Sequence, residues 1–289
     1  MDRVDPITSL DNPLAKRAWQ LQRKARVRRK EQAFWVDELP IALMAFRSGA
    51  PIETILYAEE LLRDERGRSE LEQQRKRGTA CIAVSEEVFR SLCARNNPDG
   101  LGVICKNVWS DDVDALRPDQ AATIVVLERI SDPGNLGTIL RVLDSVEHTA
   151  LVLVGQGCSP SHPRAVRASR GTVFTVPICR CPDMDTVFRW AKAHQVQTVA
   201  TSAGADTCFW AADYRPPLML LFGNEHEGLA AATKAAADQV VSIPMAGMAS
   251  SLNVTLSVGL LLYEIKRRSS QAVRGDGRRD GTRPPARGL

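Results

Sequence analysis

Residues 122–141 read ATIVVLERISDPGNLGTILR, and this stretch decides the fold class. Its first nine residues form an almost continuous apolar, β-branched run, which is typical of a strand buried on both faces of a parallel sheet. A turn with two glycines follows, and an apolar helical period begins near residue 137. A strand that runs through a tight loop into a helix is the repeating unit of a doubly wound α/β domain.

Further apolar runs repeat this pattern towards the C-terminus. We expect strands at 150–154, 198–201, 218–222 and 240–243, with helices near 137–147, 162–170, 183–194, 228–237 and 252–267. Strands with crossover helices predict one domain with a parallel sheet over 121–268. Residues 269–289 are rich in Arg, Gly, Pro and Asp, so we expect a disordered basic tail.

The N-terminal side carries a second, smaller α/β pattern. Residues 34–49, FWVDELPIALMAFRSG, indicate a helix that ends at Gly49. Alternating short strands and helices as far as residue 106 predict a compact domain over 31–106, preceded by a basic segment over 1–30. Residues 107–120 are acidic and lack an apolar period, so we interpret them as a linker.

The charge of the chain is unevenly distributed, although the formal net charge is only +4. Residues 1–30 and 266–289 each carry a net charge of +6, and the part between them carries −8. Basic ends suggest a polyanionic partner, although solvated, disordered termini have the same composition.

Several classes of protein are excluded. The longest apolar run, 252–265, is interrupted by polar residues and is too short to span a bilayer, and the N-terminus lacks the apolar core of a secretory signal. The chain has seven widely spaced cysteines, and Cys179 and Cys181 are too close together for the usual zinc pair. We therefore expect reduced thiols, no metal site and a cytoplasmic protein.

The first candidate functional loop lies within residues 131–141. Gly134 and Gly137 allow close backbone approach, Asn135 offers hydrogen-bond donors and acceptors, and Arg141 could meet an anion. A capped turn at a helix start would explain part of this pattern. Neither common nucleotide-binding fingerprint is present here, which argues against a dinucleotide-dependent enzyme.

Two more loops follow expected strands, at the edge where open parallel sheets bind ligands. In LFGNEHEGL (221–229), Glu225 could pair with Arg141 or hold a polar group, whereas a lone loop histidine such as His226 is more often an exposed residue than a general base. In the loop 243–253, Ser251 or Asn253 would cap the following helix.

Together the three loops resemble the motifs of the SpoU/TrmH family of RNA ribose 2′-O-methyltransferases, within the SPOUT class. The motifs are DPGNLGxxxR at 132–141, LFGNExxGL at 221–229 and IPMxGxxSSLNV at 243–254. RASRGTVFTVP at 167–177 is similar to the segment between the first two motifs. The resemblance covers about 121–267, and the N-terminal domain resembles, less specifically, the L30e-like substrate-binding domain of the family.

The resemblance implies S-adenosylmethionine as methyl donor, a deep trefoil knot in the C-terminal domain, and a homodimer formed through that domain, with helix 252–265 in the interface. The positions implied to bind the donor are Leu221, Phe222, Gly223, Asn224, Ile243, Met245, Ser251 and Leu252. The positions implied to act in catalysis are Asn135, Arg141, Glu225, Ser251 and Asn253.

The reaction is displacement at a methyl carbon that the sulfonium already activates, so no nucleophilic Cys or Ser is needed. Orienting the reactants can lower the barrier by about 7–11 kcal/mol. Because guanidinium groups hold their proton firmly, two roles stay open for Arg141: orienting a phosphate while its charge favours the alkoxide, or acting as a base in a site that disfavours its cation.

The resemblance favours 23S ribosomal RNA as substrate, as in the enzymes that confer resistance to thiostrepton and avilamycin. A transfer RNA 2′-O-methyltransferase and a non-catalytic RNA-binding assembly factor are the alternatives. The basic cluster at the start of the N-terminal domain is the predicted RNA-binding surface. It consists of Arg23, Lys24, Arg26, Arg28, Arg29 and Lys30.

Overall fold

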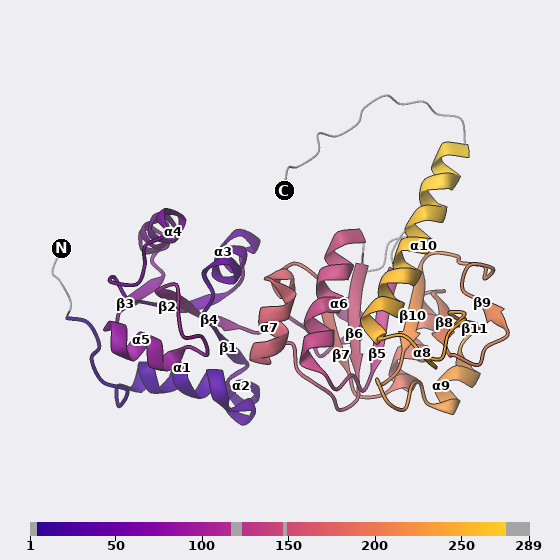
Figure 1. Ribbon diagram of the computed structural model, residues 1–289, viewed down its shortest axis with the longest axis horizontal. Helices are drawn as coiled ribbons and strands as arrows, with labels where there is room; N and C mark the ends of the chain where they lie inside the picture. Colours follow the sequence, from indigo (N-terminus) through magenta and orange to yellow (C-terminus); the bar gives the residue numbers. More distant parts are fainter. Residues whose placement is uncertain (1–4, 117–122, 147–148, 276–289) are drawn as a thin grey trace.

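The computed structural model describes residues 5–116, 123–146 and 149–275, which fold into two α/β domains arranged along the long axis of the molecule (Figure 1). The smaller domain extends to the end of β4 (Leu101–Lys106), and the larger domain begins at β5 (Thr123–Glu128). The two domains meet at α7 (Pro163–Ser169), which packs beside β1 (Ala33–Val36).

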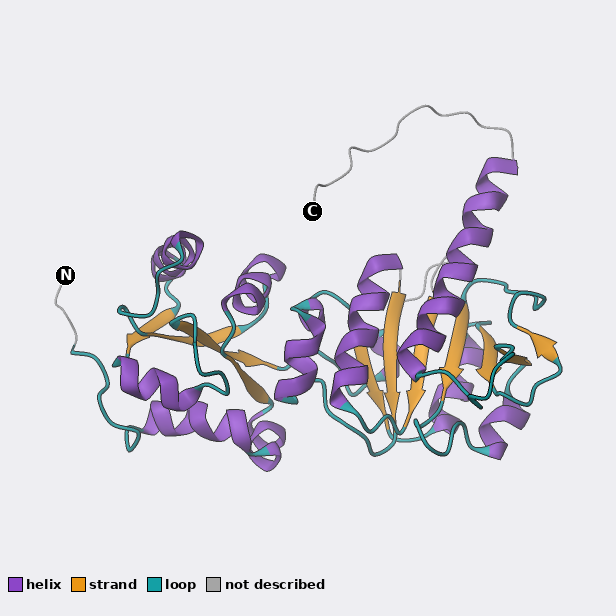
Figure 2. Ribbon diagram, viewed as in Figure 1, coloured by secondary structure: helices purple, strands orange, loops and turns teal. Residues whose placement is uncertain are grey.

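The N-terminal domain is a four-stranded sheet in the order β1-β4-β2-β3, covered by helices on both faces (Figure 2). β4 is antiparallel to β1 and to β2, while β2 and β3 are parallel. The remaining strands are β2 (Ile52–Tyr57) and β3 (Ala80–Ala83). The helices are α1 (Pro13–Arg23), α2 (Ala25–Glu31), α3 (Leu39–Ser48), α4 (Glu65–Lys76) and α5 (Glu86–Leu92).

The start of the apolar segment 34–49 corrects one prediction. Residues 34–36 lie in β1, and the helix begins only at Leu39. Phe34 packs in the core beneath α3, whereas Trp35 packs on the opposite face against α1 and α5. A strand buried on both faces shows no alternation, so its sequence cannot be told from that of a buried helix. The C-terminal cap at Gly49 is confirmed, with φ +70°.

The basic N-terminal segment is joined to this domain. Helix α1 buries Ala15, Ala18 and Leu21 in the same core as Trp35. Asn12 caps this helix, since its side chain accepts a hydrogen bond of 2.9 Å from the Leu14 amide. Only a narrow stripe of small apolar residues faces the sheet, which is why the sequence of this segment looks wholly polar.

The C-terminal domain is a seven-stranded parallel sheet in the order β7-β6-β5-β10-β8-β11-β9. This confirms the predicted α/β class, and the trefoil knot stays a prediction. The other strands are β6 (Thr149–Val154), β7 (Ile178–Cys181), β8 (Gln197–Thr201), β9 (Thr207–Cys208), β10 (Leu218–Phe222) and β11 (Gln239–Ser242). The helices besides α7 are α6 (Pro133–Val146), α8 (Met184–Ala193), α9 (Ala231–Ala236) and α10 (Val254–Gly275), with a 3-10 turn η2 (Thr172–Phe174).

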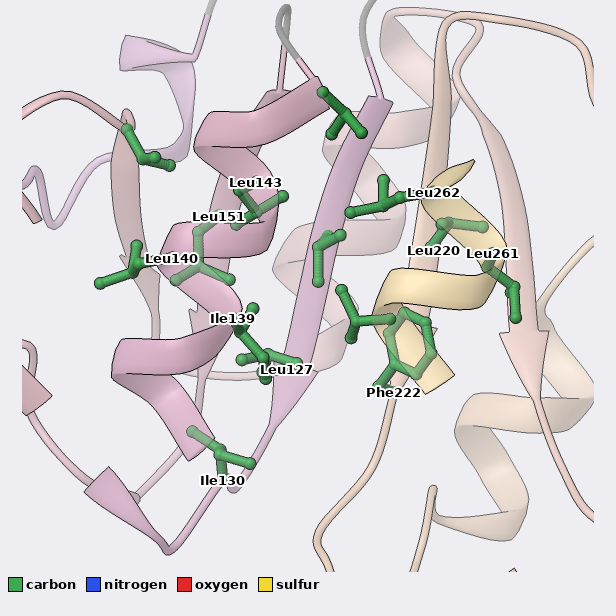
Figure 3. Close-up of a cluster of buried hydrophobic side chains, with 14 of the residues drawn as sticks. Leu127, Ile130, Ile139, Leu140, Leu143, Leu151, Leu220, Phe222, Leu261 and Leu262 are labelled. Atoms are coloured by element: carbon green, nitrogen blue, oxygen red, sulfur yellow. The ribbon is translucent and has the colours of Figure 1, made fainter. Parts of the chain in front are cut away.

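Both faces of this sheet are buried. Leu127 of β5 and Phe222 of β10 face a core that is covered by α6 and α10 (Figure 3). Val126 and Leu221, their neighbours in the chain, face a second core beneath α8. The edge strands β7 and β9 were not predicted, because Arg180 interrupts the apolar run of β7 and β9 has only two residues.

Residues 109–116 do more than connect the domains. The Trp109 ring stacks on Phe34 with centroids 5.8 Å apart, and Val113 and Leu116 are buried in the core beneath α8. A short 3-10 helix, η1 (Val113–Ala115), holds the two apolar side chains in place. The predicted linker is therefore docked on both domains as far as Leu116, and residues 117–120 lie outside the described part.

The last helix corrects the prediction of a disordered tail from residue 269. Helix α10 extends at least to Gly275, and no glycine or proline lies between Gly259 and that residue. Residues 276–289 lie outside the described part. Among the helices that the structure describes, none is both long and apolar enough to cross a membrane.

Candidate active site

Three loops meet at the carboxyl edge of the sheet. Two of them are adjacent because β5 and β10 are neighbours, with Leu127 in register with Phe222. The carboxylate of Glu225, in the loop after β10, accepts hydrogen bonds from the loop after β5. The donors are the Ser131 amide (3.1 Å) and hydroxyl (2.8 Å), the Asp132 amide (3.1 Å) and the Asn135 side chain (3.1 Å). Glu225 therefore joins the loop after β5 to the loop after β10, in which Glu225 itself lies.

The third loop joins this network through Asn253. Its Nδ2 donates to Asn135 Oδ1 at 3.1 Å, and its Oδ1 accepts a 2.8 Å hydrogen bond from the Thr255 amide in the first turn of α10. The predicted cap is thus Asn253. Asn135, which lies at the centre, is positioned by its own amide, which donates to the Asp132 carboxylate at 2.9 Å. Glu225, Asn135 and Asn253 form one chain of hydrogen bonds across the three loops.

The charge state of Glu225 is fixed by these contacts. Partial burial opposes its ionisation, but the hydrogen bonds from Asn135, Ser131 and the Asp132 amide outweigh burial and lower its pKa to about 2. Glu225 is therefore an anion at neutral pH and serves to hold the loops, with no proton to give.

A cavity of about 560 Å³ opens beside this network. Most of the predicted donor-binding and catalytic positions line it: Phe222, Gly223, Asn224, Glu225, Ile243, Met245, Ser251, Leu252 and Asn253. Leu221 is placed elsewhere, since its side chain is buried beneath α8 and its carbonyl accepts a 2.9 Å hydrogen bond from the Thr201 hydroxyl.

Sequence reasoning missed part of the lining. Thr201 ends β8, and Ser202 and Ala203 follow it, so the strand-end rule could have identified them. Lys234 on α9 also lines the cavity, and no pattern in the sequence indicated it.

The cavity suits a ligand of the size and chemistry of S-adenosylmethionine. Its volume is in the range of small-ligand sites, about 300–1,000 Å³. Phe222, Ile243 and Leu252 provide apolar walls, while Glu225 provides negative charge that favours a sulfonium cation. Gly223 is required by packing, because a Cβ there would lie 1.9 Å from the Gly228 carbonyl carbon.

Arg141 lies apart from the network. It is exposed on α6, about 9 Å beyond Asn135 along the helix axis. Glu225, which could have paired with it, is occupied by the loop after β5. His226 is exposed, and its amide donates to the Asn224 side chain at 2.9 Å.

The predicted RNA-binding cluster lies on α1 and α2. Arg23, Lys24, Arg26, Arg29 and Lys30 are exposed, and the first two lie over the Trp19 ring at 4.9 and 5.5 Å. Arg28 is a correction to this set: it is 5% exposed, and its guanidinium donates to the Leu21 carbonyl at 2.8 Å. Burial lowers the pKa of Arg28, and the residue joins α2 to α1.

Two parts of the chain match known families. Residues 122–263 match the SpoU rRNA Methylase family, and residues 12–102 match the MRM3-like substrate binding domain. A 23S rRNA (uridine(2479)-2′-O)-methyltransferase from Streptomyces viridochromogenes is 32% identical over 242 residues, which cover 79% of this chain and 80% of that protein. The chain belongs to the SpoU methylase family.

Solved structures of SpoU relatives share the arrangement of both domains. An AdoMet-bound rRNA methyltransferase from Sinorhizobium meliloti aligns with a TM-score of 0.83 and 32% identity, covering 92% of this chain and 99% of that one. The SpoU methyltransferase AviRb from Streptomyces viridochromogenes, in complex with AdoMet, aligns with a TM-score of 0.82 and 28% identity, covering 90% and 98%. These findings confirm the predicted family, S-adenosylmethionine as cofactor, and the activity of an RNA methyltransferase.

Proposed function

We propose that this SpoU enzyme methylates a ribose 2′-hydroxyl of 23S ribosomal RNA, in the cytoplasm. The network of Glu225, Asn135 and Asn253 beside the cavity is the observation that carries the proposal, because it presents polar groups where a donor and a hydroxyl would meet. The S. viridochromogenes relative, named for 23S rRNA, aligns over four fifths of its length. The MRM3-like region supplies a second, basic surface for a large RNA.

The donor side of the mechanism depends on shape. Phe222, Gly223, Ile243, Met245 and Leu252 would hold S-adenosylmethionine, which supplies a methyl group already activated by the sulfonium. The apolar walls exclude water from the reacting carbon, and the loop packing at Gly223 keeps the backbone groups of the cavity in place.

The acceptor side depends on hydrogen bonds and charge. Asn135 has a free carbonyl lone pair and an amide hydrogen beyond its two contacts, so it can orient a ribose hydroxyl. Arg141 brings a cation that stabilises the developing alkoxide or a neighbouring phosphate. Since guanidinium groups keep their proton at neutral pH, we assign Arg141 this electrostatic role, and the hydroxyl proton leaves to solvent.

We also propose that the active form is a homodimer formed through α10. Leu256, Leu260 and Tyr263 are 58%, 42% and 54% exposed and lie on one face at spacings of four and three residues. The Tyr263 hydroxyl donates to the Ser145 hydroxyl at 3.2 Å, and Ser145 lies one turn beyond Arg141 on α6. A second copy covering this apolar stripe would also approach Arg141.

Sedimentation velocity tests the dimer. L260E should shift the protein to the monomer. L10E, at a similarly exposed leucine (39%) that precedes α1 in the N-terminal domain, should leave the dimer intact. A monomeric wild-type protein at micromolar concentration would contradict the proposal.

The substrate is tested with labelled S-adenosylmethionine and unmodified transcripts of 23S and 16S ribosomal RNA and of transfer RNAs. We expect label in 23S RNA, and a reverse-transcription stop at low nucleotide concentration at one position. Label in transfer RNA alone would favour the transfer RNA alternative. The non-catalytic alternative predicts no heat when S-adenosylmethionine is titrated into the protein.

A further inference from the structure

Helix α7 is held by both domains at once. Towards the N-terminal domain, Arg167 Nε pairs with Glu38 Oε1 at 2.5 Å, and Val166 is buried in the core beneath α3. Towards the active site, α7 packs closely on α6, since a Cβ at Gly137 would lie 2.4 Å from the Ala165 carbonyl oxygen. The helix therefore fixes the position of its own side chains relative to the active-site loop.

Arg164 on α7 reaches that loop from outside. Its Nη2 lies 3.2 Å from Asp132 Oδ2, and the side chains of Arg164 and Asp132 are 64% and 41% exposed. The other Asp132 oxygen accepts the Asn135 amide, so the start of α6 stays capped whether or not Arg164 is paired. Such a solvent-exposed ion pair is weak, and a phosphate can replace the carboxylate with a bidentate contact.

Helix α2, which carries exposed cations, lies near α7. In Figure 1, α2 lies beside the lower end of α7, at the level of the loops that follow the parallel strands. The charges of α2 and of α7 both act on His162, which caps α7. Its pKa is lowered by burial and then by the positive charges of Arg28 on α2 and Arg164 on α7. Arg28 of α2 and Arg164 of α7 thus both lie near His162, which brings α2 close to the edge of the active site.

We propose that Arg164 binds a backbone phosphate of the RNA beside the target ribose and guides the strand from α2 into the active site. The inference rests on the proposed function, because it assumes an RNA acceptor. In the free protein Asp132 holds the guanidinium, and on RNA binding the phosphate takes the place of Asp132. Arg164 is a positioning residue. It is linked to the active-site loop through its partner Asp132, whose other carboxylate oxygen accepts a hydrogen bond from the Asn135 amide.

The test compares R164Q with R215Q. Arg215 forms a matched exposed pair with Asp213 (3.3 Å, 71% and 74% exposed), at the opposite edge of the sheet just before β10. RNA affinity is measured with an unmodified 23S ribosomal RNA transcript over a range of salt concentrations. R164Q should bind about 5–20-fold more weakly, with the slope of log affinity against log salt reduced by about 0.7–0.9. R215Q should match wild type.

Three further readouts separate positioning from a structural role. R164Q should raise the KM for RNA more than it lowers kcat, while its affinity for S-adenosylmethionine and its melting temperature stay at wild-type values. R164K, which keeps the charge, should restore most of the salt slope. An unchanged RNA affinity in R164Q, or an equal loss in R215Q, would overturn the inference. Failure of the wild-type protein to methylate any RNA would instead refute the proposed function.

Discussion

The two halves of the proposed active site are built differently. The donor half is a cavity formed by apolar side chains and backbone, in which Gly223 is fixed by the close approach of Gly228. The acceptor half is a chain of polar contacts that begins at the ionised Glu225 and ends at Asn253, with Asn135 between them. The donor half therefore depends on shape, whereas the acceptor half depends on charge and hydrogen-bond direction.

This difference predicts which substitutions should affect methyl transfer and which should affect donor binding. Removing the charge of Arg141 should slow methyl transfer and leave donor affinity intact. Adding volume to the donor half should weaken donor binding first. Variants that lower donor affinity and the rate of methyl transfer equally would contradict this division of the site.

The largest expected effect is that of R141A. It should lower kcat by about 1000-fold, because the acceptor half loses its only proposed electrostatic stabiliser, while affinity for S-adenosylmethionine stays within about twofold. Single-turnover methyl transfer and calorimetry measure the two quantities. R189A, an exposed arginine on α8, serves as control. Wild-type turnover in R141A would remove Arg141 from the mechanism.

G223A tests the donor half. The added methyl group would overlap the backbone of Gly228 and Leu229, so the loop must shift and the cavity must change shape. Affinity for S-adenosylmethionine should fall by more than about tenfold, as measured by calorimetry. G204A is the matched control, since a Cβ at Gly204 meets nothing within 4 Å. Unchanged affinity in G223A would show that the cavity tolerates movement of this loop.

Acid sensitivity tests Glu225 with a smaller expected effect. Its pKa in the folded chain is about 2, against an ordinary value of 4.5. The ionised carboxylate therefore adds stability above about pH 4.5, and this contribution is lost as the pH falls from 4.5 towards 2. The difference in urea midpoint between wild type and E225Q should be widest near neutral pH and should narrow below pH 4.5. A difference in urea midpoint between wild type and E225Q that does not change with pH would contradict this account.

The smallest expected effect is that of H226A. His226 is exposed, and the contact it makes to the loop uses its backbone amide, which alanine keeps. Turnover and donor affinity should stay within about twofold of wild type across pH 6–8, where a histidine base would titrate. A lost pH dependence in H226A would make the histidine part of the acceptor half.

The sequence predicted the strand ends that carry the site, because long apolar runs and glycine turns are local signals. It could not predict that Glu225 bonds to the loop after β5 instead of Arg141, since that depends on β10 lying beside β5 in the sheet. The burial of Arg28 was also missed, because it depends on α2 folding back on α1. The strand at Phe34 was missed because it depends on pairing with β4, which is distant in the sequence. Tertiary neighbours decided each of these cases.

Helix α10 has a further consequence for how this enzyme is assayed. It is about 33 Å long, begins beside Asn253 in the active site and carries the exposed apolar stripe farther along its length. A second copy of the chain that covers the stripe would thus stabilise the same helix whose first turn is capped by Asn253. Specific activity should then depend on enzyme concentration and fall on dilution below the dissociation constant of the pair, so that assembly and turnover are read from a single dilution series.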